Sequence, residues 1–366
     1  MSEFHGDGAR RDDLVLAVDG GGAKTDLALL DSSGTLLAHA RGGRSQVYYL
    51  GVDGCIEVLE SLLELATQRA GLDPRARPVA ATARLLLAGI DLPEQLAALR
   101  SAMHEQRWSD DLVIGNDTEA LLRAGSDRGW GVAVVCGTGI NCIGLAQDGR
   151  EARFLSFGSE SGDWGGGGDV GLAALAAAVR AVDGRGPRSA LESAVPAHFG
   201  LGDPFQVARA FHLEELAPAR LGELAPIVFD LAEADAVAAD ILRRLVDEVV
   251  AFARAALQRL ELMEADPDVV LGGRVLRTAP PRVAEEISQG VHAVAPRARV
   301  VVSPSDPIVG AALLGLDAIG ASATARDRAR TELDAAVAAG PAAETQRSSA
   351  LRATASPARN SFRRDS

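Results

Sequence analysis

The first residues whose types and spacing could do chemistry form a glycine turn between two apolar runs, Asp19-Gly20-Gly21-Gly22-Ala23-Lys24-Thr25-Asp26. Glycines have no side chains, so their amide N–H groups can approach an anion closely and in conformations closed to other residues. The turn therefore fits either a phosphate site or a tight β-hairpin. It is not a P-loop, because Gly-x-x-x-x-Gly-Lys-Ser/Thr is absent. It is not a dinucleotide fingerprint either, because a strand and not a helix follows the glycines.

The distribution of basic residues supports the phosphate interpretation. Of the 37 lysine and arginine residues, 36 are arginine, and Lys24 is the one lysine. The chain's only compact ammonium therefore lies beside the glycine turn, where a point charge suits a phosphate oxygen.

The opening pattern recurs later in the chain. Residues 131–136 predict a strand, Gly137-Thr138-Gly139 a turn and residues 140–146 a second strand. The interval from Gly20 to Gly137 is 117 residues, which is about the length of a domain. The repeat predicts two related domains that face each other. Two facing glycine turns can clamp a polyphosphate, so the duplicated pair favours a nucleotide site over a plain hairpin.

Asp117 and a glycine-rich loop are the next candidates. Asp117 follows an expected strand at residues 112–115, and the carboxyl ends of strands are where ligands meet open α/β sheets. A helix is expected to begin directly after it, so Asp117 could equally be an N-cap. The loop at residues 158–171 is too rich in glycine to be core and is shaped for close approach to a ligand. Within it, Asp169 could cap the following helix.

The elements that must position these residues follow from hydrophobic periodicity. Three strands form an antiparallel meander, and helices then alternate with two further strands, which predicts a mixed sheet flanked by helices. Expected elements of the first half are strands at 14–18, 27–30, 35–40, 79–87 and 112–115 and helices at 52–70, 92–103 and 118–123. The second half repeats the meander, is mostly helical over residues 188–262, and has strands at 269–271, which ends in Gly272-Gly273, and at 300–302.

These elements divide the chain into two α/β domains with short flanks. The expected parts are a flexible N-terminus (1–12), an N-terminal domain (13–123), a C-terminal domain (124–305), a small-residue helix that packs back on the N-terminal domain (306–320) and a largely disordered tail (321–366). A short helix over residues 326–339 is an alternative within that tail. From residue 341 onward, large apolar residues are too few for an ordered core.

Composition excludes several classes of protein. A net charge of −13 argues against a general binder of nucleic acid or of an anionic membrane. The apolar runs are short or interrupted by charge, so no transmembrane helix is expected. The cysteines Cys55, Cys136 and Cys142 form no Cys-x-x-Cys pair, and no secretory signal precedes Asp19. We therefore expect a cytoplasmic protein that binds a small ligand together with its cation.

Taken together, these motifs resemble those of the N-acetylglucosamine kinase family, also called the BadF/BadG/BcrA/BcrD-type ATPases, within the actin, hexokinase and heat-shock chaperone superfamily. The resemblance covers about residues 13–320. The motifs that carry it are Asp19 to Asp26, Asn116-Asp117, Cys136 to Cys142, Trp164-Gly165 with Gly168-Asp169-Val170-Gly171, and Leu271-Gly272-Gly273. It implies two ribonuclease-H-like (actin-like ATPase) domains with ATP bound in the cleft between them and a sugar beneath the ATP.

The resemblance also implies roles for individual residues. Asp117 matches the catalytic base, which would also contact the sugar. Residues that match the two phosphate loops and the adenosine loop are Gly20, Gly21, Gly22, Ala23, Lys24, Thr25, Gly137, Thr138, Gly139, Gly272 and Gly273. Residues that match sugar-contacting segments are Ser45, Gln46, Trp164, Gly165 and Asp169. Asp19 is the expected partner of Mg²⁺, directly or through water.

Three positions depart from the family pattern. Ala23 stands where the family usually has Thr, Gln46 where Asn often contacts the sugar, and Val170 where Glu is usual. The last two bear on which sugar is bound more than on the chemistry.

The leading hypothesis is an ATP- and Mg²⁺-dependent kinase of an amino sugar, N-acetylglucosamine or glucosamine. Phosphoryl transfer needs alignment and charge stabilisation, for which glycine amides, Mg²⁺ and one carboxylate suffice. One alternative is an ATPase activator with an iron–sulfur cluster at a dimer interface, for which the three cysteines are poor ligands. Another is a non-catalytic ATP and sugar sensor, which Ala23 and Val170 favour but which the intact Asp117 and glycine turns disfavour. The particular sugar, the hydroxyl phosphorylated and a homodimeric state are left open.

Overall fold

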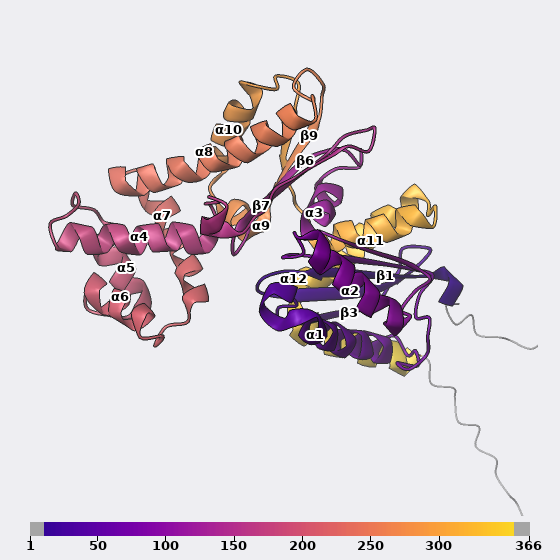
Figure 1. Ribbon diagram of the computed structural model, residues 1–366. Coiled ribbons are helices and arrows are strands. Elements are labelled where there is room, and N and C mark those ends of the chain that lie inside the picture. Colours follow the sequence, from indigo (N-terminus) through magenta and orange to yellow (C-terminus); the bar gives the residue numbers. More distant parts are fainter. Residues whose placement is uncertain (1–10, 355–366) are drawn as a thin grey trace, which may run out of the picture.

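The computed structural model describes residues 11–354, with side chains for residues 11–340 other than Asp12. Two five-stranded mixed sheets organise these residues, in the strand orders β3-β2-β1-β4-β5 and β10-β9-β6-β7-β8. Helices flank both sheets (Figure 1). The predicted fold, two α/β halves that each contain a mixed sheet, is confirmed.

The first sheet begins with the predicted antiparallel meander. Its strands are β1 (Leu14–Gly20), β2 (Thr25–Asp31), β3 (Leu36–Gly42), β4 (Thr82–Leu87) and β5 (Asp111–Gly115). β1 pairs antiparallel with β2 and parallel with β4. Every residue of β1 is buried, because helices cover both faces of the sheet at this central strand. The parallel strands β1, β4 and β5 all end at the same edge, which brings Asp19 and Asp117 together.

The second sheet repeats this order. Its strands are β6 (Gly131–Cys136), β7 (Ile140–Leu145), β8 (Glu151–Arg153), β9 (Asp268–Gly272) and β10 (Arg299–Val302). β6 pairs antiparallel with β7 and parallel with β9, as β1 does with β2 and β4. The two glycine turns therefore occupy equivalent places in the two sheets.

Twelve α-helices lie in the described chain. They are α1 (Val47–Arg69), α2 (Pro93–Gln106), α3 (Asp117–Gly125), α4 (Gly167–Val182), α5 (Leu191–Phe199), α6 (Pro204–His212), α7 (Ala225–Leu231), α8 (Ala236–Arg259), α9 (Gly273–Thr278), α10 (Pro281–His292), α11 (Pro307–Ala318) and α12 (Ala323–Thr354). Short 3₁₀ helices are η1 (Arg11–Asp13), η2 (Gly158–Glu160) and η3 (Pro218–Leu224).

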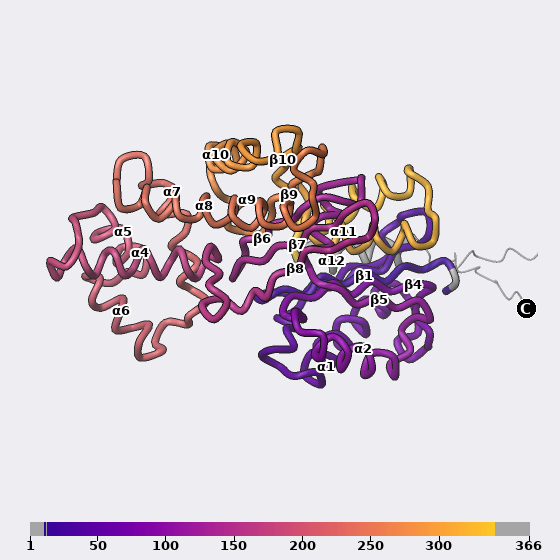
Figure 2. Tube along the Cα trace, turned by 45° about the horizontal axis from the view of Figure 1, so that its top comes forward, coloured from indigo at the N-terminus to yellow at the C-terminus, as the bar shows by residue number. Residues whose placement is uncertain are grey.

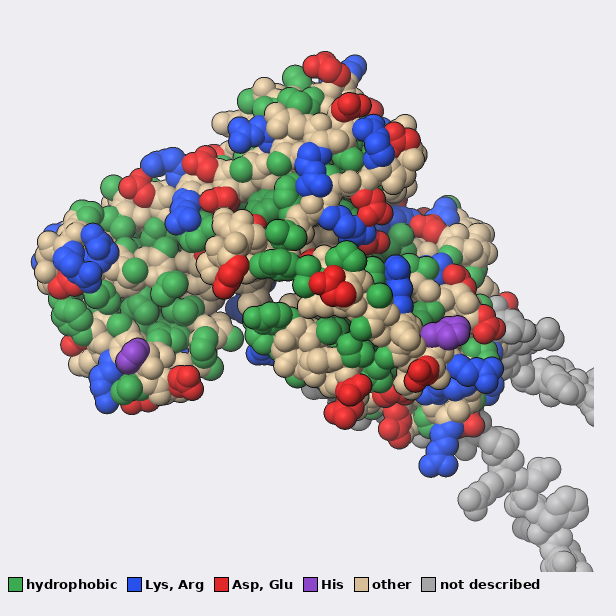
Figure 3. Space-filling view, in the orientation of Figure 1, with side chains coloured by type: hydrophobic (Ala, Val, Ile, Leu, Met, Phe, Trp, Pro, Cys, Tyr) green, Lys and Arg blue, Asp and Glu red, His purple; other side chains and the backbone are tan. Residues whose placement is uncertain are grey.

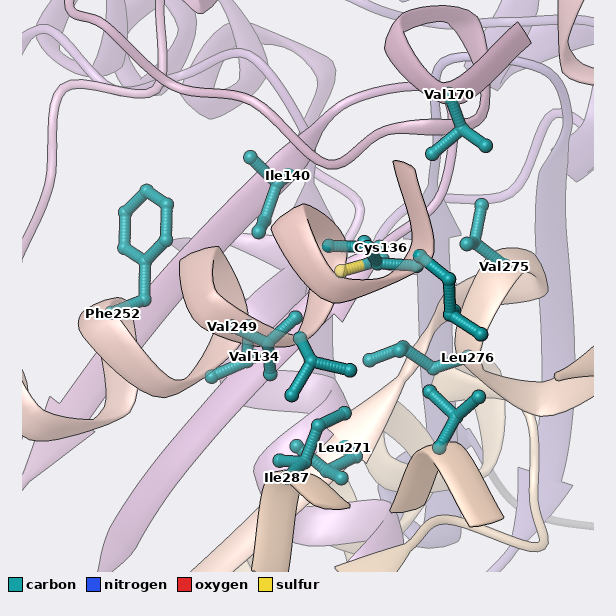
Figure 4. Close-up of a cluster of buried hydrophobic side chains, with 14 of the residues drawn as sticks. Val134, Cys136, Ile140, Val170, Val249, Phe252, Leu271, Val275, Leu276 and Ile287 are labelled. Carbon is teal, nitrogen blue, oxygen red and sulfur yellow. The ribbon is translucent and has the colours of Figure 1, made fainter. Parts of the chain in front are cut away.

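Each sheet has its own hydrophobic core. We call β1–β5 with α1, α2, α11 and α12 the N-terminal lobe, and β6–β10 with α4–α10 the C-terminal lobe. In the C-terminal core, Val134 and Cys136 of β6 pack with Leu271 of β9 and with residues of α8, α9 and α10 (Figure 4). Leucine, valine and alanine fill most of both cores, as the scarcity of aromatic residues requires.

The last two helices pack on the N-terminal lobe, next to the strand with which the chain begins. Both ribbon and tube views place α11 and α12 beside β1 (Figures 1 and 2). Val15, Ala28 and Leu30 of the sheet form a third cluster with Leu316 of α11 and Leu333 of α12. A Cβ on Gly315 would lie 2.3 Å from Val15 Cγ1, so α11 packs against β1 in close contact.

The expectation of a largely disordered segment from residue 321 is wrong for residues 323–340, and the alternative of a helix over residues 326–339 is confirmed. They belong to α12, on which the side chains of Ala325, Ala329, Leu333 and Ala336 are buried. The spacing of these four residues is helical, so one face of an otherwise polar helix can cover the sheet. The helix is broken at Gly340, whose φ is +67°. The expected flexible residues 1–10 and tail residues 355–366 lie outside the described part of the chain.

The surface is hollowed between the two lobes (Figure 3). α3 connects the two sheets along the chain and α11 returns to the first lobe, so the backbone crosses between the lobes at two places. The edge that carries the first glycine turn therefore faces the edge that carries the second.

Candidate active site

The first two glycine turns lie against each other. A Cβ on Gly22 would lie 3.3 Å from Thr138 Oγ1 of the second turn and 3.1 Å from Gln46 Oε1. Each turn is closed by its own backbone hydrogen bond, Gly21 N–H to Lys24 O at 2.8 Å and Gly137 N–H to Gly139 O at 2.8 Å. No atom lies within 4 Å of where a Cβ on Gly137 or Gly139 would stand. This open space beside two sets of backbone amides fits a phosphate group.

The third glycine turn adjoins the second. Gly273 has φ +84°, and a Cβ there would lie 2.3 Å from the carbonyl oxygen of Cys136. A Cβ on Gly272 would lie 2.3 Å from Leu121 Cδ1 of α3. Both positions therefore require glycine, because the chain is tightly packed there. The structure brings all three turns together at the junction between the lobes.

Asp117 is the first residue of α3, and its environment is unusual. The N-cap is Asn116, whose side chain accepts a hydrogen bond from Thr118 N–H at 3.1 Å, so the interpretation of Asp117 as the cap is wrong. The Oδ1 atom of Asp117 is buried and has no hydrogen-bond partner among the described residues. Burial, and next the negative charge of Asp91, raise the pKa of Asp117 to about 7. A carboxyl group with a pKa near neutrality and a free oxygen can accept a proton from a bound hydroxyl.

Asp19 is the second carboxylate at this edge of the sheet. Burial and the charges of Asp26 and Asp117 raise its pKa well above the ordinary value, although Lys24 and Arg41 oppose the shift. A buried carboxylate near a second one is relieved when a cation binds. Asp19 therefore fits a site for Mg²⁺ carried with a phosphate ligand.

Lys24 forms ion pairs within the protein. Its ammonium lies 3.0 Å from Asp26 Oδ2 and 3.0 Å from Asp306 Oδ2, and its side chain is 40% exposed. Burial opposes ionisation of Asp26, but hydrogen bonds from His39 and Arg41, together with the charges of Lys24 and Arg41, outweigh burial and lower its pKa. The ammonium has three N–H donors, so it can keep both carboxylates and still offer one donor to a phosphate.

The two residues that match the first sugar-contacting segment differ in accessibility. The side chain of Ser45 is buried, and its hydroxyl accepts a hydrogen bond from Thr25 Oγ1 at 2.9 Å. Ser45 therefore supports the glycine turn from its buried side. Gln46 lies between the turn and the loop after β4, since its Nε2 atom would be 3.4 Å from a Cβ on Gly89.

The glycine-rich loop before α4 packs on the second turn. Gly167 N–H donates to Gly137 O at 2.9 Å. Asp169 Oδ2 accepts from the amides of Gly165 and Gly166 at 3.1 and 3.0 Å, so this carboxylate holds the loop at the start of α4. The N-cap of α4 is Gly166 and not Asp169. The guanidinium of Arg244 lies 4.2 Å from the centre of the Trp164 ring. In this structure Trp164 and Asp169 make contacts that shape the loop.

The structure adds two polar residues that the sequence analysis did not single out. Asp91, in the loop after β4, accepts hydrogen bonds from the side chains of Asn116 and Asn141 at 2.9 and 3.3 Å. Asn141 lies on β7, two residues after the second glycine turn. Asp91 follows an expected strand just as Asp117 does, and this shared position is the signal that could have identified it.

The three cysteines are buried and lie in hydrophobic surroundings. Burial raises the pKa of Cys55 to about 11 and raises those of Cys136 and Cys142 further. Within the described residues, no group of three or more His, Cys, Asp or Glu side chains is arranged to hold a metal ion. No helix between residues 11 and 354 is long and apolar enough to cross a membrane.

Two lobes of repeated topology, with facing glycine turns and a buried carboxylate between them, define a two-domain actin-like ATPase fold. Residues 16–315 match the BadF/BadG/BcrA/BcrD ATPase family, and the chain belongs to that family. The resemblance drawn from the motifs is thus confirmed.

Similar proteins are named as sugar kinases. The N-acetylmuramic acid/N-acetylglucosamine kinase of Clostridium acetobutylicum is 23% identical over 82% of this chain and 97% of its own length. The N-acetyl-D-glucosamine kinase of Dictyostelium discoideum is 24% identical over 83% of this chain and 98% of its own.

Solved structures are similar over the same part of the chain. A candidate N-acetylglucosamine kinase from Chromobacterium violaceum superposes with a TM-score of 0.66 and 29% identity, over 82% of this chain and 98% of that one. A ROK family glucokinase from Streptomyces griseus, solved with glucose and AMPPNP, has a TM-score of 0.51 at 18% identity, over 83% of this chain and 99% of that one. The second likeness concerns the fold alone.

Proposed function

We propose that the chain is an ATP-dependent kinase that transfers the γ-phosphoryl group to a hydroxyl of an amino sugar, with N-acetylglucosamine or glucosamine as the acceptor. The observation that carries the proposal is Asp117. Its unpartnered, buried oxygen lies at the edge of the sheet where two glycine turns converge. The names of the relatives from Clostridium acetobutylicum and Dictyostelium discoideum support the choice of an amino sugar.

The residues present fit ATP with Mg²⁺. The backbone amides of Gly20 to Gly22 and of Gly137 to Gly139 would hold the phosphates, and Gly272-Gly273 would contact the adenosine. Lys24 would add an ammonium, and Asp19 would face the Mg²⁺, directly or through water. Bound ATP supplies the phosphoryl group, and its Mg²⁺ neutralises charge that develops on the phosphate oxygens.

The protein's own contribution is alignment and proton transfer. Asp117 accepts the proton of the sugar hydroxyl. The hydroxyl oxygen forms a bond to the γ-phosphorus, and the bond from the γ-phosphorus to the β,γ-bridging oxygen breaks. ADP is the leaving group. Gln46, next to the first turn, and the loop with Trp164 and Gly165 are the proposed sugar contacts, with Asp169 holding that loop. Because ATP is the donor, we place the reaction in the cytoplasm.

A screen of ATP consumption tests the proposal. ADP formation should be measured with N-acetylglucosamine, glucosamine, N-acetylmuramic acid and glucose, and the product analysed by phosphorus NMR. Sugar-dependent ADP formation with a phosphate ester is the expected result. Sugar-dependent thermal stabilisation without turnover would instead show a sensor, and stoichiometric iron in the purified protein would show an activator.

A further inference from the structure

Asp91 occupies a central place at the junction of the two lobes. It follows β4, which lies between β1 and β5, so it stands between the strand ends that carry Asp19 and Asp117. Its Oδ1 atom accepts hydrogen bonds from Asn116 Nδ2 at 2.9 Å and from Asn141 Nδ2 at 3.3 Å. Asn116 belongs to the end of the first sheet and Asn141 to the second sheet, so one carboxylate oxygen joins both.

The orientations of the two amides are fixed by their other partners. The Oδ1 atom of Asn116 accepts from Thr118 N–H at 3.1 Å and from the Thr118 hydroxyl at 2.7 Å. The Oδ1 atom of Asn141 accepts from Cys142 N–H at 2.7 Å and from the Ser156 hydroxyl. Both NH₂ groups are therefore directed at residue 91, which must supply an acceptor. The Asn141 NH₂ group has a second, longer contact with Asn116 Oδ1 at 3.4 Å.

These contacts connect the two parts of the proposed reaction. Asn116 caps α3, whose first residue is Asp117. Asn141 follows the second glycine turn by two residues. We infer that Asp91 is a positioning residue, which joins the turn that would hold the transferred phosphate to the helix that carries the base. The kinetic consequences of this inference rest on the proposed function. Its structural consequences rest on the hydrogen bonds alone.

The charge of Asp91 has a second consequence. Asp117 is faced by Asp91, by Glu119 on its own helix and by Asp19 at the end of β1, all acidic. Asp91 is faced in turn by Arg153 of β8 and by Asp163 of the glycine-rich loop. Burial raises the pKa of Asp91 to about 6, so it carries negative charge at neutral pH. That charge disfavours ionisation of Asp117 and makes it a stronger base when ionised.

Two substitutions separate the hydrogen bonds from the charge. Asp91→Asn keeps an oxygen acceptor and removes the charge. The pH at which kcat/KM falls on the acid side should move down by about half a unit to one unit, while kcat at pH 8.5 stays within about threefold of wild type.

Asp91→Ala removes the acceptor as well. It should lower kcat by about 10- to 100-fold, with a smaller change in the KM for ATP. Asp240→Asn, an exposed change on α8, is the control and should leave the pH profile unmoved.

A merely structural role for Asp91 would give a different pattern. Activity would fall in proportion to the folded fraction in both variants, and the pH profile would stay in place. An unshifted profile in Asp91→Asn, or wild-type kcat in folded Asp91→Ala, would overturn the inference.

A second measurement does not need activity. In urea unfolding, the losses of stability caused by Asp91→Ala and Asn141→Ala should not add in the double variant, because the two side chains are in contact. Additive losses would contradict the hydrogen-bond junction. If wild type forms no ADP with any sugar, the kinase proposal fails, and this cycle still decides whether Asp91 joins the lobes.

Discussion

Asp117 combines two features that rarely occur together at the start of a helix. A carboxylate at a helix N-terminus is ordinarily stabilised by the helix dipole. Here burial and the neighbouring Asp91 outweigh that effect and raise its pKa to about 7. An ionised carboxylate in this position lowers the stability of the fold. Its Oδ1 atom has no hydrogen-bond donor among the described residues. This is the environment expected of a general base that works near neutral pH.

Replacing the proposed base should abolish most activity without unfolding the protein. Asp117→Asn preserves the size of the side chain and leaves the cap to Asn116. We expect kcat to fall by about 10² to 10⁴, since general base catalysis contributes factors of that order. ATP binding, measured by calorimetry, should persist because the glycine turns are unchanged. Near wild-type turnover by the folded variant would require another base.

The same substitution predicts a change in stability that depends on pH. The pKa of Asp117 is raised in the folded state, so the folded carboxyl holds its proton between about pH 4 and pH 7 while the unfolded one has lost it. Ionisation therefore destabilises the fold as pH rises through this window. Asp117→Asn should melt at a higher temperature than wild type at pH 8, and the difference should vanish near pH 4. An equal difference at both pH values would mean that the stability effect does not come from this titration.

At the scale of single residues, the sequence identified some of the candidate site. Asp117 and the glycine turns were recognisable because a strand followed by glycine or by an acid is a local pattern. Asp91 also follows an expected strand, but it was not singled out. Its hydrogen bond to Asn141 of β7 joins different sheets, so no local periodicity encodes that contact. The role of Asn116 as the cap was missed because two adjacent residues can both cap a helix, and side-chain geometry decides between them.

The crossing of α3 and α11 is a close contact between the helices that connect the lobes. A Cβ on Gly310 would lie 1.8 Å from the carbonyl oxygen of Ala120. Gly310→Ala must therefore push the two helices apart, which should destabilise the protein by about 1–3 kcal/mol, even though alanine favours a helix. Chemical denaturation measures this loss. Gly43→Ala is the matched control, because no atom lies within 4 Å of a Cβ there, and it should change stability little.

The packing of α12 predicts how truncation of the chain affects stability. A chain that ends at residue 340 keeps Ala325, Ala329, Leu333 and Ala336, whose side chains are buried against the first lobe. Its melting temperature and activity should stay near those of the full chain. A chain that ends at residue 322 loses all four and should melt at a clearly lower temperature, because burial of apolar side chains is the main stabilising contribution. Equal melting temperatures for the two truncations would mean that α12 adds nothing.

The strands and most helices could be predicted from hydrophobic patterns, whereas α12 was expected only as an alternative to disorder. Its sequence is rich in alanine and arginine, a composition that also fits disorder. The helix is ordered by a narrow apolar face, which packs against the first sheet. That sheet is formed by residues about 300 positions earlier in the chain. Tertiary packing, rather than composition, decided the outcome.

For the whole molecule, the position of the turns on different lobes predicts closure. The proposed transfer requires the phosphates, the sugar and Asp117 to converge, and two lobes linked at two crossings can rotate toward each other. Small-angle scattering should give a smaller radius of gyration with an ATP analogue and sugar together than for the protein alone. The analogue alone provides the comparison, and an unchanged radius with both ligands would contradict a cleft that closes.

The packing of α11 and α12 on the first sheet also affects how the chain must be made. Strands β1 to β5 are complete by residue 115, yet one face of their sheet is covered by residues beyond 307. On the ribosome, the N-terminal lobe therefore waits with Val15, Ala28 and Leu30 uncovered while the entire C-terminal lobe is synthesised. Nascent chains that carry such an apolar face are prone to aggregate. The first lobe to be synthesised is therefore the last to be finished, and premature termination before α11 leaves a product with an exposed hydrophobic sheet.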